Sequence, residues 1–209
     1  MNDKIINLGT LVLCAVTLIC SYKSNAQDFT NDSYKRFGFI AGMNISDMNF
    51  NKGVPRPSIP VSATWKSGIT IGFLLHIPLS ENLFIQPGYS YTQRSGADKS
   101  KGINYSIGYL SMPVLLKYKI SSRFAFVAGP QAELTIYSNA DSNGVKSNIT
   151  HDVEERSIGV TAGFDIHLIN SFFISARYMQ GLNHIGIGQR SNVKEFKYEV
   201  VDISIGIGF

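Results

Sequence analysis

The stretch VDISIGIGF, residues 201–209, decides the fold. Its apolar side chains stand at every second position: Val201, Ile203, Ile205, Ile207 and Phe209. The positions between them hold an aspartate, a serine and two glycines. A period of two indicates a β-strand with two unlike faces, because successive side chains of a strand point to opposite sides. We therefore expect residues 201–209 to form a strand with one apolar face and one face of small and polar residues.

The same alternation recurs in seven earlier segments, which gives an even number of strands. These segments are residues 37–45, 68–79, 83–91, 109–120, 124–136, 157–168 and 172–182, and the last strand is expected to start at Lys197. The connections alternate in length: residues 79–82, 120–123 and 168–171 are short, whereas 47–66, 93–104, 138–156 and 183–196 are long and polar. Short turns at one end and long loops at the other are typical of outer-membrane barrels.

The composition of the two faces separates a membrane barrel from a soluble one. The polar face is rich in glycine and serine, which suits the narrow interior of an eight-stranded barrel. The apolar face is nearly free of charge, as expected against lipid, where a lysine or arginine costs about 2–4 kcal/mol at the midplane. Tyrosines near the strand ends fit aromatic girdles: Tyr89, Tyr91, Tyr118 and Tyr178. The predicted fold is all-β, an eight-stranded antiparallel transmembrane β-barrel, and the alternative is a soluble periplasmic lipocalin-like ligand-binding calyx.

The start of the chain has the pattern of a secretory signal peptide. Lys4 precedes an apolar run, and Ser24 and Ala26 form a small-x-small cleavage site. We expect residues 1–26 to be cleaved, residues 27–36 to form an N-terminal periplasmic segment, and residues 37–209 to form the barrel. Cys14 and Cys20 lie in the segment expected to be removed, so no disulfide is expected. The net charge of +4 without basic runs gives no reason to expect a nucleic-acid partner.

The last strand has a second expected role besides closing the barrel against the first. An apolar, alternating strand that ends on Phe209 looks like the terminal signal that outer-membrane assembly machinery recognises. The expected location is the cell outer membrane. The expected partners are outer-membrane lipid, the barrel-assembly machinery and another envelope or secretion protein at the long loops, and the chain is expected to be a monomer.

Several strand sequences also resemble a known family. They are FGFIAGMNIS (37–46), IQPGYSYTQRSG (85–96), YLSMPVLLKYKI (109–120), GVTAGFDIHL (159–168) and ISARYMQGLNHI (174–185). In this order they resemble the strands of the PorT-family outer-membrane β-barrel proteins of Bacteroidota. The resemblance implies an integral barrel, and the family's namesake serves a protein-secretion system. Ser111 departs from the family pattern, which usually has an acidic residue there.

Five charged residues are expected inside the barrel: Lys117, Glu133, Asp165, Arg177 and Asp202. Charges excluded from bulk water need partners, so this polar cluster is interpreted as a structural plug, with a gate or proton path as the alternative. His76 and His167 are expected on the same face and could bind a metal together with Asp165. Hydrogen-bonded structural histidines are the favoured interpretation, so no metal is predicted.

The segment HDVEERS, residues 151–157, contains the strongest hint of catalysis. His151 and Asp152 with Ser147 suggest an outer-membrane acyltransferase or hydrolase, but closeness in sequence does not establish triad geometry. A solvated outer loop is the favoured interpretation. The glycine pairs in GIGQR and GIGF lack the strand-to-helix context of a phosphate site. The sequence therefore predicts an integral outer-membrane protein with a structural, binding or secretion-accessory role, without catalysis or cofactor, and an outer-membrane enzyme is the alternative.

Overall fold

The computed structural model describes residues 35–52, 64–98, 102–142, 144–168, 171–187 and 194–209. Eight long strands make up most of this part of the chain: β1 (Phe37–Asn49), β2 (Lys66–Leu75), β4 (Leu83–Asp98), β5 (Ile103–Lys119), β6 (Phe124–Ser142), β8 (Arg156–His167), β9 (Phe172–Gly181) and β11 (Lys194–Gly208). Short strands and 3-10 turns lie between them: η2 (Phe50–Lys52), β3 (Ile77–Pro78), β7 (Val145–Asn148), η3 (Thr150–Asp152) and β10 (Ile185–Ile187). No helix within these ranges is long and apolar enough to cross a membrane. The expected signal peptide and residues 27–34 lie outside the described residues.

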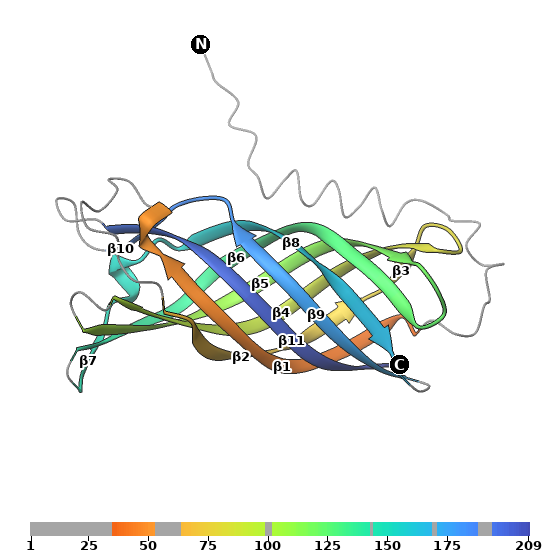
Figure 1. The fold of residues 1–209 in the computed structure, drawn as a ribbon, viewed down its shortest axis with the longest axis horizontal. Helices are drawn as coiled ribbons and strands as arrows, with labels where there is room; N and C mark the ends of the chain where they lie inside the picture. Colours follow the sequence, from red (N-terminus) through yellow and green to blue (C-terminus); the bar gives the residue numbers. More distant parts are fainter. Residues whose placement is uncertain (1–34, 53–63, 99–101, 143, 169–170, 188–193) are drawn as a thin grey trace, which may run out of the picture. The chain divides into compact units, whose positions relative to one another are not determined.

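Antiparallel pairing closes the eight long strands into a barrel. Each strand pairs with the next along the chain, and β1 pairs again with β11 from Gly38 opposite Gly208 to Asn49 opposite Lys197. Figure 1 shows this seam, with β1 in orange beside β11 in dark blue. The Phe37 and Phe209 amides each donate to the other residue's carbonyl, at 3.1 and 2.9 Å. The predicted fold class is confirmed, and a closed barrel suits lipid because an open edge would leave backbone groups unpaired.

The apolar face points outward and the small-residue face points inward. On β11, the Ile203 and Ile205 side chains are 58% and 62% exposed, whereas Ser204 between them is buried. On β8, Phe164 is exposed and its neighbour Asp165 is completely buried. A soluble calyx keeps its apolar side chains inside, so the calyx alternative is wrong.

The outward apolar band ends at a sharp edge near the long connections. There, an apolar or aromatic outward position is followed two residues further out by a polar one: Tyr91 by Gln93, Ile158 by Arg156, Tyr178 by Gln180 and Val201 by Glu199. The apolar part of β11, residues 201–209, has the length of about 9–11 residues that a tilted strand needs to cross a bilayer. We take this edge as the outer boundary of the membrane-spanning part.

The barrel has tight turns at one end and long connections at the other, as expected. Parts of the long connections, however, are strands and not the loops that the sequence predicts. The tight turns are closed by backbone hydrogen bonds from Leu79 to Leu83, Ile120 to Phe124 and Leu168 to Phe172, at 2.8 to 2.9 Å. At the other end, β4 continues to Asp98, β5 starts at Ile103, and β6 continues to Ser142 and turns into β7. Beyond the lipid, outward side chains face water and are polar. The alternation of apolar and polar residues by which a strand is recognised in the sequence therefore ends there, although the strand continues.

The inward glycines allow neighbouring strands to approach closely. A Cβ atom at Gly163 would lie 2.2 Å from the Ala176 carbonyl oxygen on β9. A Cβ atom at Gly42 would lie 2.3 Å from the Ile203 carbonyl oxygen on β11. Larger side chains at these positions would push the strands apart, so glycine is a packing requirement of this narrow barrel.

Candidate functional site in the barrel interior

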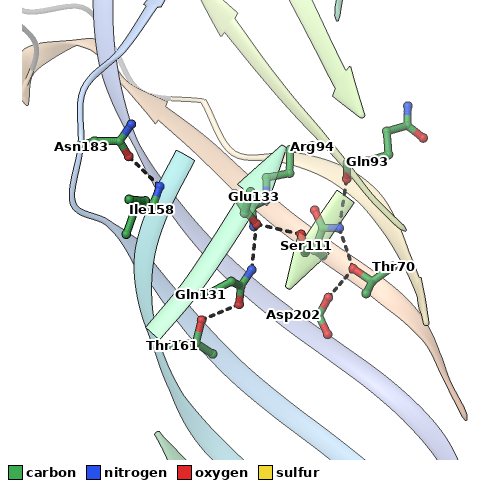
Figure 2. Close-up of polar contacts among 11 residues, drawn as sticks. Thr70, Gln93, Arg94, Ser111, Gln131, Glu133, Ile158, Thr161, Asn183 and Asp202 are labelled. Atoms are coloured by element: carbon green, nitrogen blue, oxygen red, sulfur yellow. Dashed lines mark hydrogen bonds and ion pairs between the residues drawn. The ribbon is translucent and has the colours of Figure 1, made fainter. Parts of the chain in front are cut away.

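A buried ion pair links Arg94 on β4 to Glu133 on β6. The Arg94 Nη1 atom donates to Glu133 Oε2 at 2.5 Å, and Nη2 donates to Oε1. Ser111 on β5 and Gln131 on β6 also donate to Oε1, at 2.9 and 2.8 Å, as Figure 2 shows. The two charged side chains are only 2% and 0% exposed. A bidentate pair with additional hydrogen bonds is the arrangement in which opposite charges can be buried together.

Aromatic rings enclose the guanidinium of this pair. The Arg94 Cζ atom lies 5.4 Å from the Tyr109 ring centroid and 5.1 Å from that of Tyr198, within the range of cation–π attraction. Both tyrosines belong to a buried hydrophobic cluster at the end with the long connections. Its members are Met48, Phe50, Tyr105, Ile107, Tyr109, Val153, Met179, Ile185, Phe196, Tyr198 and Val200. This hydrophobic cluster fills the interior above the Arg94–Glu133 pair.

A second charged cluster joins Lys117 on β5, Asp165 on β8 and Arg177 on β9. The Lys117 Nζ atom lies 2.7 Å from Asp165 Oδ2, and both side chains are fully buried. Ser175 donates to Asp165 Oδ1 at 2.8 Å, and Arg177 Nη2 lies 3.7 Å from the same oxygen. The Arg177 Nε atom donates to Ser175 Oγ at 2.8 Å, so one carboxylate organises two cations and a hydroxyl.

Asp202 on β11 forms a third group with hydroxyl side chains. Thr70 on β2 donates to Asp202 Oδ2 at 2.5 Å, and Ser204 donates to Oδ1. Asp202, Thr70, Arg94 and Arg177 all contribute to the lining of one interior cavity of about 40 Å³. At about 10–15 Å³ of such volume per water molecule, this cavity suits a few waters and is too small for an organic ligand.

The structure places all five predicted interior charges inside the barrel but does not bring them into one cluster. Lys117, Asp165 and Arg177 are in contact, whereas Glu133 and Asp202 lie in separate groups. The partner of Glu133 is Arg94, which the sequence reasoning missed because it ended the strand at Tyr91 and assigned residues 93–104 to a loop. The signal was present, since Thr92 and Arg94 continue the inward positions of Gln86 and Ser90.

Ser111 on β5 lies beside the buried carboxylate of Glu133. The Ser111 hydroxyl donates to Glu133, so an acidic residue here would place a second carboxylate beside a buried one. A serine supplies a hydrogen-bond donor and avoids that repulsion, because like charges brought together away from water destabilise each other.

The two inner-face histidines have hydrogen-bond partners. The His76 Nε2 atom accepts from Gln86 Nε2 at 3.1 Å, and its Nδ1 atom lies 3.1 Å from the Lys35 carbonyl oxygen. The His167 Nε2 atom lies 3.4 Å from Lys117 Nζ. Within the part of the chain that the structure describes, no three His, Cys, Asp or Glu side chains are grouped so as to hold a metal ion.

The residues of the suggested catalytic loop lie in different elements. Ser147 is in β7 and pairs with Ala140, whereas His151 and Asp152 are in η3. Val153, which follows them, is 5% exposed and packs into the hydrophobic cluster. The interpretation of residues 151–157 as a solvated loop is therefore only partly right, because Val153 and Ser157 are buried and β8 already begins at Arg156.

Polar contacts tie η2 to neighbouring segments at the same end. The Lys52 Nζ atom lies 2.6 Å from Glu199 Oε1. The backbone carbonyl oxygen of Lys52 lies 3.0 Å from His184 Nε2. The Thr64 amide donates to Asp47 at 3.1 Å. Burial raises the pKa of the Asp47 carboxyl above its ordinary value, and this hydrogen bond acts in the opposite direction.

Comparisons with known proteins agree with this architecture. Among solved structures, the chain resembles Neisserial surface protein A, with a TM-score of 0.53, 14% identity, and coverage of 83% of this chain and 97% of that one. It also resembles Ail, the attachment invasion locus protein of Yersinia pestis, with a TM-score of 0.51, 13% identity, and coverage of 84% and 99%. No curated protein matches the sequence. At such low identity the structural likeness shows the fold alone, but the family model for the outer membrane protein beta-barrel domain matches residues 25–186. The chain belongs to that family, and its location is the outer membrane.

Proposed function

We propose that this chain is a sealed, non-catalytic outer-membrane barrel that acts as a binding protein through its outer end. The observation that carries the proposal is the packing of the interior. Two buried ion pairs, Arg94–Glu133 and Lys117–Asp165, occupy the lumen, and the hydrophobic cluster fills the end with the long connections. A conducting barrel needs a continuous polar path, and the packed interior of this one favours a role other than a pore.

The outer end offers the surface for binding. Strands β4, β5 and β6 continue past the apolar band and, with β7, form a paired extension of mainly polar residues. Binding residues are often carried on such projecting segments while the scaffold beneath stays rigid. We infer that another envelope protein is bound there.

Membership of the PorT family, within the larger barrel family, is part of this proposal. It is supported by the β5 sequence from Tyr109 to Tyr118, and it makes an accessory role in protein secretion the form of binding to test first. The proteins released by cells lacking this chain should then differ from those of the parent strain, with restoration by the full-length gene.

Conductance and co-purification test the proposal. Refolded protein in planar bilayers should give no stepwise conductance, and stable open channels would contradict a sealed interior. Replacing residues 140–147, which include β7 except its last residue, Asn148, by a two-residue Asn-Gly turn should remove co-purifying envelope proteins from cross-linked membranes. The matched control is Arg177→Leu, which changes the interior and should retain them. Equal recovery with the shortened hairpin would contradict binding at this end.

A further inference from the structure

The barrel wall is irregular where β2 meets β4. These strands pair only from Thr70 opposite Thr92 to Leu74 opposite Gly88, although β4 continues to Asp98. Beyond this pairing, the β4 backbone is bound by side chains of β1. Asn44 donates to the Gln93 carbonyl oxygen at 3.0 Å, and the Ser46 hydroxyl donates to the Ser95 carbonyl oxygen at 2.8 Å and accepts from the Ser95 amide at 3.1 Å.

A glycine makes this displacement of β4 possible. A Cβ atom at Gly68, an inward position of β2, would lie 2.0 Å from the Gln93 carbonyl oxygen. β4 therefore passes against the inner side of β2 instead of continuing beside it. At this point the outward surface of β4, β5 and β6 lies closer to the barrel axis than the start of β2 does.

This displacement of β4 creates a groove of about 470 Å³ on the outside of the barrel wall. Its floor carries hydroxyl and amide side chains from β4, β5 and β6: Gln93, Ser95, Asn104, Ser106 and Asn139. Lys66 lines it from β2 and Lys146 from β7, and neither lysine forms an ion pair among the described residues. Asp141, opposite Lys146 in the β6–β7 pairing, also lines the groove, so two cations face one anion.

The groove lies directly outside the apolar band. Gln93 lies two residues after Tyr91 at the band's edge, and the Tyr91 hydroxyl is 2.9 Å from the hydroxyl of Tyr137, which lines the groove. Tyrosines with polar tips mark the level of lipid headgroups. Whatever occupies the groove is therefore at the depth of the headgroups of the outer leaflet.

We propose that this groove binds the phosphorylated saccharide headgroup of an outer-leaflet glycolipid. The hydroxyl and amide side chains match a sugar's many donors and acceptors, and Tyr137 offers an aromatic surface. Lys66 and Lys146 match the phosphate, because ammonium groups form strong charge-assisted hydrogen bonds with phosphate oxygens. The headgroup's acyl chains would lie along the apolar band beneath. This proposal depends on the outer-membrane location and not on the protein partner proposed above.

The chain contains a built-in reporter for the test. Trp65 is its one tryptophan, is 44% exposed, and precedes Lys66 at the start of β2. Mature protein refolded in uncharged detergent micelles is titrated with rough-type lipopolysaccharide while tryptophan fluorescence is followed. Native mass spectrometry of the same samples counts retained lipid molecules. We expect saturable binding by both measurements; no saturable binding by mass spectrometry overturns the proposal.

Two double variants distinguish binding in this groove from a general attraction of the lipid to positively charged side chains. Lys66→Gln/Lys146→Gln should weaken binding by about tenfold or more, because each charge-assisted contact contributes substantially to affinity. Arg156→Gln/Lys197→Gln removes two cations at the same end of β8 and β11 and should bind as the parent does. All variants are first checked for the heat-dependent gel shift of a folded barrel. Equal weakening in both double variants overturns the proposal.

Three further ligands test the chemistry of the headgroup. Dephosphorylated lipopolysaccharide should bind at least about tenfold more weakly than the intact lipid if the lysines contact phosphate. Phosphatidylglycerol has a phosphate but no saccharide and should compete poorly. Free glucosamine 1-phosphate should also compete poorly, because it lacks acyl chains to hold it at the band. Equal competition by either compound overturns the assignment to a glycolipid.

Discussion

Replacing Asp165 by asparagine tests whether the interior charges stabilise the barrel as a network. The substitution keeps the size of the side chain and removes the charge that faces Lys117 at 2.7 Å and Arg177 at 3.7 Å. With an effective dielectric constant of about 20, unit charges at these distances attract by about 6 and about 4 kcal/mol. Part of that attraction is offset by the cost of burying the charges. We expect Asp165→Asn to lower the free energy of unfolding by about 3–5 kcal/mol, the usual cost of breaking a buried pair.

Replacing Lys117, the partner of Asp165, should lower the free energy of unfolding by less, because Asp165 keeps its other contacts. In Lys117→Met, the Asp165 carboxylate keeps Arg177 and the hydrogen bond from Ser175, so we expect about half the loss. The double variant Lys117→Met/Asp165→Asn leaves one unpaired cation instead of two, so it should be more stable than Asp165→Asn alone. Such non-additivity is expected for residues that share a network.

Urea unfolding in lipid vesicles provides the measurement. Refolded parent and variants are followed by tryptophan fluorescence and by the heat-dependent gel shift of the folded barrel. An Asp165→Asn variant within about 0.5 kcal/mol of the parent would behave as an ordinary surface substitution, and the network interpretation would be refuted. Strictly additive losses in the double variant would also refute it.

The remaining predictions concern the fold and the second cation of this cluster. Arg177→Leu should lower the temperature at which the folded gel band disappears, because it removes a cation beside Asp165; an unchanged temperature would count against an ion-pair role. Gly163→Val should abolish the folded band, because even a Cβ atom there lies 2.2 Å from a β9 carbonyl oxygen, whereas Ala162→Val on the outward face should fold. Ile205→Lys should lower the free energy of unfolding in bilayers by about 2–4 kcal/mol, and Lys197→Gln, beyond the apolar band, should change it by less than about 0.5 kcal/mol. A charge at position 205 that is tolerated in bilayers would show that this side chain does not face lipid.

The membrane-spanning part of the fold was predictable from the sequence because lipid and the packed interior impose opposite requirements on alternate residues. Val160 and Phe164 lie outside while Asp165 is buried, as the period of two predicts. Above the apolar band this contrast disappears, so the extensions of β4 and β6 were assigned to loops. The same loss of contrast hid Arg94, which lies just past Tyr91. The alternation of polar and apolar residues also could not predict which interior charges pair with each other, because that depends on how far neighbouring strands are staggered around the barrel.

The same physical contrast indicates where this protein's specific chemistry lies. In the membrane-spanning part, outward residues must be apolar and inward residues must pack or pair, so most of their identities follow from folding alone. Neither requirement applies to the outward polar residues of β4, β5 and β6 above the band, because these residues contact neither lipid tails nor the packed interior. Their gathering around a groove bounded by Lys66 and Lys146 is therefore not explained by folding. Gly68 and the β1 side chains that hold β4 inward create that groove at the cost of regular pairing between β2 and β4. A barrel wall that departs from regular pairing beside a polar recess is the expected arrangement when that recess, and not the lumen, is the binding site.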